Sequence, residues 1–485
     1  MSAIALPGPV AVLLGGAVAV YLVARLLPER NELLAGLSAI CLALSLVAEL
    51  AGREAPALWN ARAGLRQIAV TASGDPGALI VPLALLLGIM VAIYGGKYMS
   101  RDRRIDRYYP LLLLMLAGTA GTIVEKDLFT LYLYIALSTG ASYVLVAFRR
   151  DTDTAIEAGF KYAIMASMGS LLMLSGIALV WRGTGTLRLP MAIDARDIWQ
   201  VLGTALLTSG LLIKSAVFPA HTWLPDAHGR APSSISALLS GIVVPVQLYT
   251  LVRLGLSLGM PRASFGWLLA SLGISSMLAG NLLALRQTYG KRLLGYSTIA
   301  HLGYMLVAFG LGIAFDSQEA FAVGLLLLIS HALLKALAFL AKGTLHYYYD
   351  ATLLSDLDGL AYRAPLPSGL LVFALLGLAG LPPAPLFIAK LGLLWALPGL
   401  SGGAVYAMAG LVMLGSLIGV GYYLPIVGRL LRHPAAPVET QPHANWIQLP
   451  MVTLALLAVI IGLWSAPLWH AALQGAQQIL AQVPL

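Results

Sequence analysis

Apolar residues follow one another along this chain in runs of about 20, separated by short polar connections. A run of that length forms a helix that crosses the roughly 30 Å hydrocarbon core of a bilayer. The pattern therefore predicts an all-α polytopic membrane protein with about 14 transmembrane helices. We place the spans at residues 7–27, 32–51, 77–99, 109–125, 127–148, 160–182, 199–219, 233–258, 264–286, 293–314, 318–344, 366–397, 403–428 and 447–470.

The polar connections are too short to form a soluble domain. The longest of them cover residues 52–76, 183–198, 345–365 and 429–446. We expect residues 183–199 to form a surface loop and the tail from Ala471 to form a short interfacial helix. The first apolar run lacks a basic start and a cleavage site, so we expect it to be retained as a helix. All chemistry is then expected inside the membrane.

Composition and charge agree with this class of protein. Of the 485 residues, 59% are hydrophobic and 11% are charged, and the net charge is +9. The basic residues are spread among the loops, which argues against a nucleic-acid-binding domain. Lysine and arginine are about twice as frequent in the loops of one side as in those of the other. Since basic loops stay in the cytoplasm, this bias predicts that both termini lie on the outer side.

This sequence lacks the ligand residues that electron-carrying groups need. Cys41 is the single cysteine, and an iron–sulfur cluster needs about four thiolates. No dinucleotide-binding, P-loop or zinc-protease motif is present. We therefore expect no cofactor, no metal and no active site in this chain. An enzymatic activity would come from a larger complex.

Three lysines, Lys214, Lys335 and Lys390, interrupt apolar stretches that are long enough to span a bilayer. A charge at that depth costs at least ~2.5 kcal/mol, so it normally faces a protein interior or a water-filled path. Prolines that can break the spanning helices accompany two of these lysines. The predicted helix breaks are Pro219, Pro382, Pro383 and Pro385. Charge beside a broken helix is typical of an ion path.

Histidines extend the set of titratable groups. His331 and Lys335 are four residues apart and share a helix face, as do Ser297 and His301. Because burial disfavours the charged form of lysine, such residues can load and release a proton. The alternatives are that Lys335 reaches towards the headgroups and that the histidines are packing residues.

Other charged residues have simpler interpretations. His221, Asp226 and His228 lie in one loop, where hydrogen bonds that order the loop are favoured over a metal site. Glu157 and Lys161 are four residues apart and are expected to pair on a helix surface.

Several motifs resemble one family in order along the chain. They are YMSRDRRIDRYY (98–109), DLFTLYLY (127–134), the stretch LIKSAVFPAHTWLPDAHGRAPSS (212–234), KRLLGYSTIAHLGYM (291–305), HALLKALAFL (331–340) and LAGLPPAPLFIAK (378–390). Together they resemble the antiporter-like subunits shared by respiratory complex I, Mrp cation/proton antiporters and membrane-bound hydrogenases or formate hydrogenlyase. The resemblance implies that a polar axis at mid-membrane carries protons. Its members here are Lys214, His301, His331, Lys335 and Lys390.

Two positions depart from the family pattern. The glutamate expected after Ile135 is Ala136, and the lysine expected in the helix that follows the Trp-Leu-Pro-Asp stretch (223–226) is Pro245. Glu125 lies about 16 Å from position 136 along a helix, which is too far to replace that glutamate. We therefore expect a degenerate first half around Lys214 and a more complete second half around His331, Lys335 and Lys390.

Two five-helix blocks, each with a lysine beside a helix break, suggest an inverted repeat. The predicted organisation is an N-terminal group of spans (1–108), a first repeat (109–258), a second repeat (259–430) and a C-terminal span with its tail (431–485).

The leading hypothesis is a proton-translocating subunit of a complex I-type or hydrogenase-type redox complex in a bacterial or archaeal cytoplasmic membrane. Its partners would be other membrane subunits and peripheral iron–sulfur or flavin subunits. Two alternatives stay open: a subunit of an Mrp-like antiporter or inorganic-carbon uptake assembly, and a structural subunit that conducts nothing.

Overall fold

The structure is a computed structural model that describes residues 6–27, 30–54, 76–102, 104–149, 153–396, 403–433 and 444–481. Within these ranges the regular secondary structure is helical, and β-structure is limited to two isolated bridges. The helices of the first half are α1 (Gly8–Leu26), α2 (Asn31–Glu54), α3 (Gly77–Tyr98), α4 (Ile105–Val124), α5 (Leu128–Val146), α6 (Asp153–Thr184), α7 (Ile198–Lys214), α8 (Trp223–Arg230), α9 (Ser233–Leu238), the π-helical turn η1 (Leu239–Val243) and α10 (Val244–Ser257). Those of the second half are α11 (Arg262–Ala284), α12 (Gly290–Ala314), α13 (Gln318–Tyr349), the 3-10 turn η2 (Ser355–Leu357), α14 (Leu360–Arg363), α15 (Pro365–Ala379), α16 (Pro385–Ala396), α17 (Gly403–Leu430), α18 (Asn445–Leu463) and α19 (Ala466–Ala481).

Twelve helices in the described ranges are long and apolar enough to cross a membrane, and α9, η1 and α10 together count as one of them. Three shorter apolar helices accompany them: α7, α15 and α16. The 14 predicted segments all correspond to helical structure, because α7 and the pair α15–α16 supply the remaining two. The protein is an all-helical integral membrane protein, as the apolar pattern predicted.

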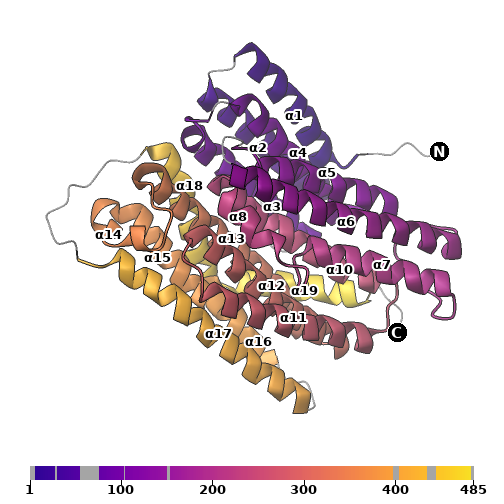
Figure 1. Ribbon diagram of the computed structural model, residues 1–485. Helices are drawn as coiled ribbons and strands as arrows, with labels where there is room; N and C mark the ends of the chain where they lie inside the picture. The colour runs from indigo at the N-terminus through magenta and orange to yellow at the C-terminus, as the bar shows by residue number, and fades with distance from the viewer. Residues whose placement is uncertain are drawn as a thin grey trace.

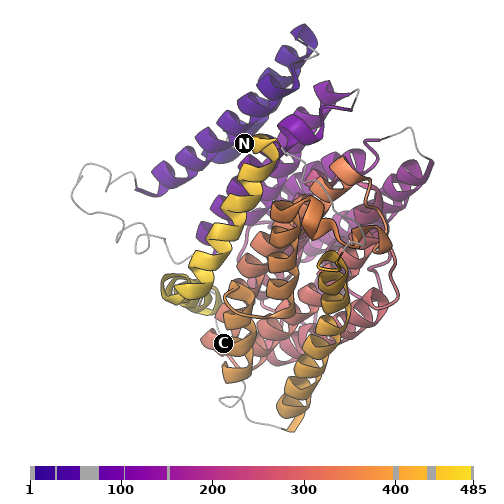
Figure 2. The same ribbon diagram turned by 90° about the vertical axis from the view of Figure 1, so that its left-hand side faces the viewer.

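The centre of the bundle consists of α12, α13 and the span α9–η1–α10. Nearly every residue of these helices is buried inside the molecule, whereas α1, α2, α17 and α18 expose most of their surface. Figure 1 shows α1 and α2 at the upper edge, and Figure 2 shows the C-terminal helices α15–α18 covering another side. A helix that is apolar on all sides is buried by its neighbours. Polar groups on α12 and α13 are therefore shielded from lipid.

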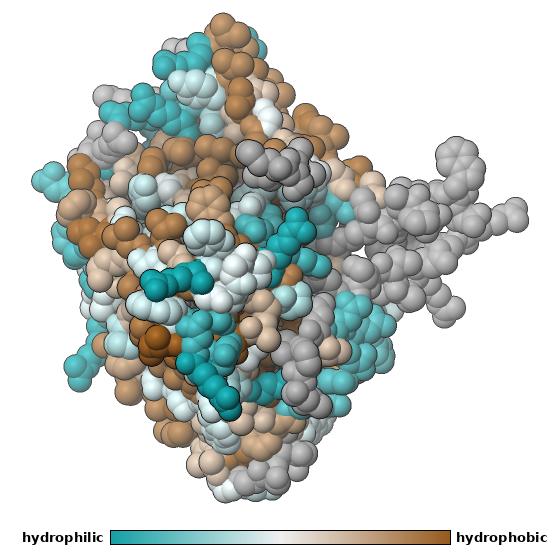
Figure 3. Space-filling model, turned by 90° about the vertical axis from the view of Figure 1, so that its right-hand side faces the viewer, coloured by the Kyte–Doolittle hydropathy of each residue, from teal (hydrophilic) through white to brown (hydrophobic). Residues whose placement is uncertain are grey.

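Loops that were predicted to share a side of the membrane meet at one end of the bundle. Arg149 pairs with Asp102, and Arg429 pairs with Asp358. We call this end, which carries Arg101, Arg149, Arg292 and Arg429, the basic end. At the opposite end the backbones of Asp127 and Arg188 form an isolated β-bridge, and the side chain of Arg262 pairs with that of Asp316. Figure 3 views the molecule from the side towards which α6 and α7 extend, and hydrophilic residues gather near the middle of that face.

Several predicted boundaries were wrong. α7 ends at Lys214 rather than at residue 219, since Ala216 adopts a positive φ of 50° and starts the turn that leads to α8. The span at 366–397 is divided beside the prolines named as helix breaks, Pro382, Pro383 and Pro385: the chain turns at Gly380 with φ 94°, and Pro385 starts α16. The C-terminal helix begins at Ala466 rather than at Ala471, and its buried face packs against α13.

Candidate functional site

His331 and Lys335 lie at the centre of α13, and both side chains are completely buried. Lys335 Nζ donates hydrogen bonds to the Leu294 carbonyl (2.7 Å) and to Ser297 Oγ, both on α12. A spacing of four residues places His331 on the same face of α13, one turn away. All partners of the Lys335 ammonium in the described residues are neutral. No carboxylate among the described residues therefore compensates the charge of this group.

His301 on α12 continues the chain of polar groups beyond His331. The two imidazole rings have centroids 5.3 Å apart, and His301 Nε2 lies 3.5 Å from the hydroxyl of Tyr423 on α17. Nδ1 of each histidine is buried and has no hydrogen-bond partner in the structure. Buried polar groups in proteins are usually satisfied by protein atoms or by ordered water. Two unpartnered nitrogens beside facing rings are therefore suited to a water-assisted transfer of protons.

Lys390 lies on α16, at the break between α15 and α16. Its Nζ donates to the carbonyls of Leu378 (3.3 Å) and Ala379 (3.2 Å), which are freed where α15 ends. The same ammonium lies 4.9 Å from the ring centroid of Tyr304, whose own ring is 5.8 Å from that of His301. The helix break thus brings Lys390 to the far end of the group formed by Lys335, His331 and His301.

A cavity of about 530 Å³ opens beside Lys390, between α16 and α17. Its walls are almost entirely apolar. We call the central network the set formed by the half-buried Lys390 and six buried residues: Lys335, Ser297, His331, His301, Tyr304 and Tyr423.

Lys214 stands apart from the central network. It is the last residue of α7, and its Nζ donates to the Ala166 carbonyl (3.2 Å) and to Thr139 Oγ1 (3.5 Å). Lys214 forms no ion pair within the described ranges. Ala136 lies one turn before Thr139 on α5, so the position at which the family carries glutamate is close to this lysine. Its lost carboxylate has not been replaced from another element.

The loop residues behave differently from one another. His221 Nδ1 contacts the Pro219 carbonyl at 3.2 Å, and Asp226 pairs with Lys161 and Arg292 at 3.3 and 3.1 Å. Both residues make local polar contacts of the kind predicted, but Asp226 lies on α8 and not in a loop, and its ion pairs attach that helix to α6 and α12. The prediction was wrong for His228, because neither of its ring nitrogens has a hydrogen-bond partner in the structure although the side chain is fully buried.

The predicted surface pair of Glu157 and Lys161 is present at 2.7 Å. Sequence reasoning missed Tyr304, Tyr423 and Ser240 as neighbours of the buried histidines. Tyr304 carried a signal, since it follows His301 by three residues on the same helix. Tyr423 and Ser240 reach the network from distant helices, and only the folded arrangement reveals them.

Comparisons with known proteins agree with this arrangement. Residues 125–419 match the family described as NADH:quinone oxidoreductase/Mrp antiporter, TM. The NADH-quinone oxidoreductase subunit N of Desulforudis audaxviator (strain MP104C) is 31% identical over 424 residues, which cover 81% of this chain and 81% of that protein.

Two solved structures share the fold. A chain of the membrane-bound sulfane sulfur reductase, an archaeal respiratory membrane complex, has a TM-score of 0.85 at 25% identity, with 98% of this chain and 99% of that chain covered. A chain of the Mrp complex from Dietzia sp. DQ12-45-1b has a TM-score of 0.83 at 21% identity, with 97% of each chain covered.

Proposed function

Because this chain belongs to the NADH:quinone oxidoreductase/Mrp antiporter family, we propose that it moves protons across the membrane as one subunit of a larger redox complex. The observation that carries the proposal is the central network. Lys335, His331 and His301 are buried and Lys390 is half-buried, and the four side chains follow one another between α12, α13, α16 and α17 with neutral partners among the described residues. Charged groups at this depth are maintained chiefly where ions or protons pass.

Protons are the ions that best match these side chains. The network consists of amines, imidazoles and hydroxyls, which exchange protons readily. Sodium would need several oxygen ligands, and among the described residues no carboxylate contacts the network. We infer that a change in the neighbouring subunits moves a proton between Lys335 and Lys390 through the two histidines.

The relatives support one type of complex over the others. The similarity to NADH-quinone oxidoreductase subunit N favours a complex I-type assembly, in which peripheral iron–sulfur or flavin subunits would supply the electrons. The similarity to the sulfane sulfur reductase chain is compatible with a related respiratory complex. The bias of basic residues supports a proposed orientation with the basic end in the cytoplasm and both termini outside, in a bacterial or archaeal cytoplasmic membrane.

The first half of the chain is proposed to contribute structure rather than conduction. Ala136 leaves Lys214 without a carboxylate, and Pro245 removes the next lysine of the family pattern. We retain the division into two five-helix repeats, 109–258 and 259–430, as part of this proposal.

Purification of the tagged chain in mild detergent tests the proposal first. We expect iron, flavin and soluble subunits to co-purify with it. A preparation that contains membrane subunits alone would refute the redox assignment and would favour an Mrp-like antiporter or a carbon-uptake assembly. Reconstitution of the purified complex into vesicles with a pH-sensitive dye then measures proton movement directly.

A further inference from the structure

Titratable side chains continue along α13 from the central network to the basic end. His331, Lys335, Lys342 and His346 are separated by 4, 7 and 4 residues. At 100° per residue they fall within about 60° of one another around the helix. Lys342 is buried and donates to the Ala351 carbonyl, whereas His346 is half-buried. One face of α13 therefore carries these groups from mid-membrane to the surface.

His346, the outermost of these four groups, faces a polar pocket at the basic end. The pocket has a volume of about 240 Å³ and is lined by Tyr98, Arg101, Asp102, Arg149, His346, Tyr347 and Asp350. Every lining residue has a polar side chain, so water can enter the pocket and reach His346. From His346 the next group is Lys342, one helical turn deeper.

A gap separates Lys342 from the central network. Seven residues along α13 correspond to about 10.5 Å, which is too far for a proton to pass directly between the two lysines. His228, at the end of α8, lies beside this gap. Its ring packs on Phe339 with centroids 4.9 Å apart, and Phe339 lies between Lys335 and Lys342 in α13. The opposite edge of the imidazole faces α12, where a Cβ added to Gly295 would lie 3.3 Å from His228 Cδ2.

The polar atoms beside the gap lack partners. Both ring nitrogens of His228 and the hydroxyl of Ser233 are buried without a hydrogen bond in the structure. A Cβ added to Gly343, the neighbour of Lys342, would lie 2.8 Å from Ser233 Oγ. A neutral imidazole presents one donor and one acceptor, and such groups deep in proteins are typically bridged by ordered water.

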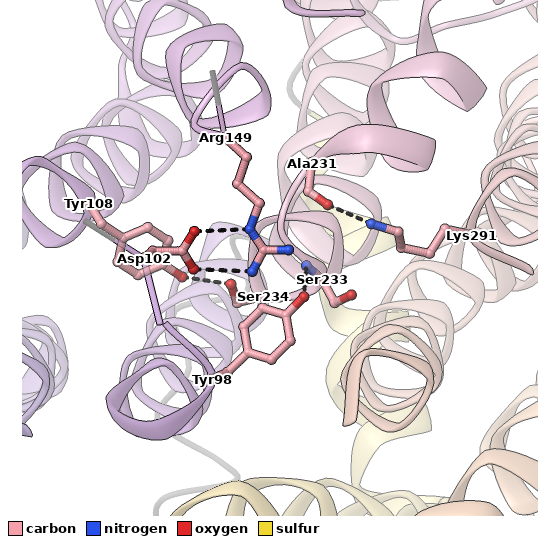
Figure 4. Close-up of polar contacts among 8 residues, drawn as sticks. All are labelled: Tyr98, Asp102, Tyr108, Arg149, Ala231, Ser233, Ser234 and Lys291. Carbon is pink, nitrogen blue, oxygen red and sulfur yellow. Dashed lines mark hydrogen bonds and ion pairs between the residues drawn. The ribbon is translucent and has the colours of Figure 1, made fainter. Parts of the chain in front are cut away.

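The connection between α8, which carries His228, and α9, which begins with Ser233, is held by contacts from other helices. We call this connection the corner, and Figure 4 shows its residues Ala231, Ser233 and Ser234. Lys291 Nζ donates to the Ala231 carbonyl at 2.8 Å, and the backbone N–H of Ser233 donates to the Tyr98 hydroxyl at 3.2 Å. Tyr108 donates to Ser234 Oγ at 2.7 Å. Because three separate helices fix this corner, the missing partners of His228 are not explained by a loose loop.

We propose that His228 connects the basic-end pocket to Lys335, so that protons reach the central network through His346, Lys342 and His228. The inference rests on the proposed function, since it gives the proton route an inlet. It assigns to His228 a role other than ordering its loop. His228 accepts a proton at one ring nitrogen and releases it from the other, and no group is consumed.

Cysteine labelling tests the inlet without relying on transport. In a Cys41→Ala background, Lys342→Cys, His228→Cys and the matched control Leu337→Cys are labelled with N-ethylmaleimide in vesicles that expose the basic end. Leu337 is fully buried and lies on the opposite face of α13. We expect positions 342 and 228 to react at least tenfold faster than position 337. Labelling at 342 with none at 228 would overturn the role of His228.

Proton movement in the reconstituted complex provides the second measurement. His228→Phe retains the stacking on Phe339 but removes both nitrogens, and we expect it to reduce proton movement as strongly as Lys335→Met. The control is His470→Phe, an exposed position on α19. Full proton movement in His228→Phe, with subunit content unchanged, would refute the inlet alone. Absence of proton movement in the unsubstituted complex would refute the proposed function, and labelling would then still decide whether water reaches His228.

Discussion

His331 Nε2 donates a hydrogen bond to the backbone carbonyl of Ser240 at 3.2 Å. Ser240 belongs to η1, where the N–H of Val244 bonds to the Leu239 carbonyl five residues earlier. In the same π-helical pattern, position 245 would donate to Ser240, but Pro245 has no N–H. The proline that replaces the family lysine therefore leaves a carbonyl for His331. The contact fixes the proton of His331 on Nε2 and leaves Nδ1 as an acceptor.

Pro245→Ala is expected to reduce proton movement severalfold. The new N–H would compete with His331 for the Ser240 carbonyl, and the imidazole would lose its fixed orientation. Because Pro245 lies in the first turn of α10, where proline is tolerated, its removal should change stability little. Proton movement and the Tm of the purified complex are the measurements.

Pro365→Ala is the control for this substitution, since Pro365 is an exposed proline in the first turn of α15. Unchanged proton movement in Pro245→Ala would show that the contact of His331 with Ser240 has no role in the relay.

Lys390→Met is expected to lower proton movement to less than a tenth, whereas Lys214→Met should lower it by less than about twofold. Lys390 closes the central network beside Tyr304, while Lys214 makes its hydrogen bonds to α5 and α6 alone. Dye-monitored proton uptake in vesicles measures both effects, with Lys126→Met as an exposed control at the opposite end. Equal losses would contradict the degenerate first half, and no loss in either would indicate a structural subunit.

Apolar run lengths predicted the fold well because the hydrocarbon core dictates them. The ends of helices were less predictable. Pro219 predicted a break after Lys214, but the exact end of α7 depends on the positive φ of Ala216, a conformation that alanine rarely adopts. A polar connection was predicted at residues 52–76. Residues 55–75 of this connection lie outside the residues that the structure describes.

The candidate site was predictable only in part, for a related reason. Lysines in apolar runs stand out in a sequence, and His301, His331 and Lys335 do lie together. Partners contributed by other helices, such as Tyr423, leave no periodic trace. His228 was misassigned because its sequence neighbours His221 and Asp226 do make local polar contacts, while the partnerless state of its ring follows from the packing of α8 against α12 and of the ring against Phe339.

Ala136→Glu is expected to pair with Lys214 and to stabilise the complex. Position 136 lies one helical turn from Thr139, which already accepts a hydrogen bond from Lys214 Nζ. A partly desolvated pair of this kind typically shows a coupling of about 1–3 kcal/mol in a double-mutant cycle. The cycle combines Ala136→Glu with Lys214→Met and follows Tm. Ala136→Gln is the uncharged control. Equal Tm values for Ala136→Glu and Ala136→Gln would show that the carboxylate does not reach the lysine.

Asp102→Asn is expected to destabilise the basic end by roughly 1–2 kcal/mol. Arg149 Nε and Nη2 donate to the two oxygens of Asp102 at 3.0 and 3.1 Å, and the two side chains retain 32% and 14% of their exposure. Burial lowers the pKa of Arg149, but Tyr98 and Asp102 outweigh it and raise that pKa above its ordinary value, so the guanidinium stays charged at every accessible pH. Neutralising its partner leaves this charge uncompensated, with the remaining solvent exposure reducing the loss. Arg149→Lys should cause a similar loss, because lysine cannot donate in the paired geometry.

The measurement is Tm, and the control is Glu157→Gln at the exposed pair with Lys161, for which we expect no measurable change. If the two pairs proved equally dispensable, the pair of Asp102 and Arg149 would not stabilise the basic end.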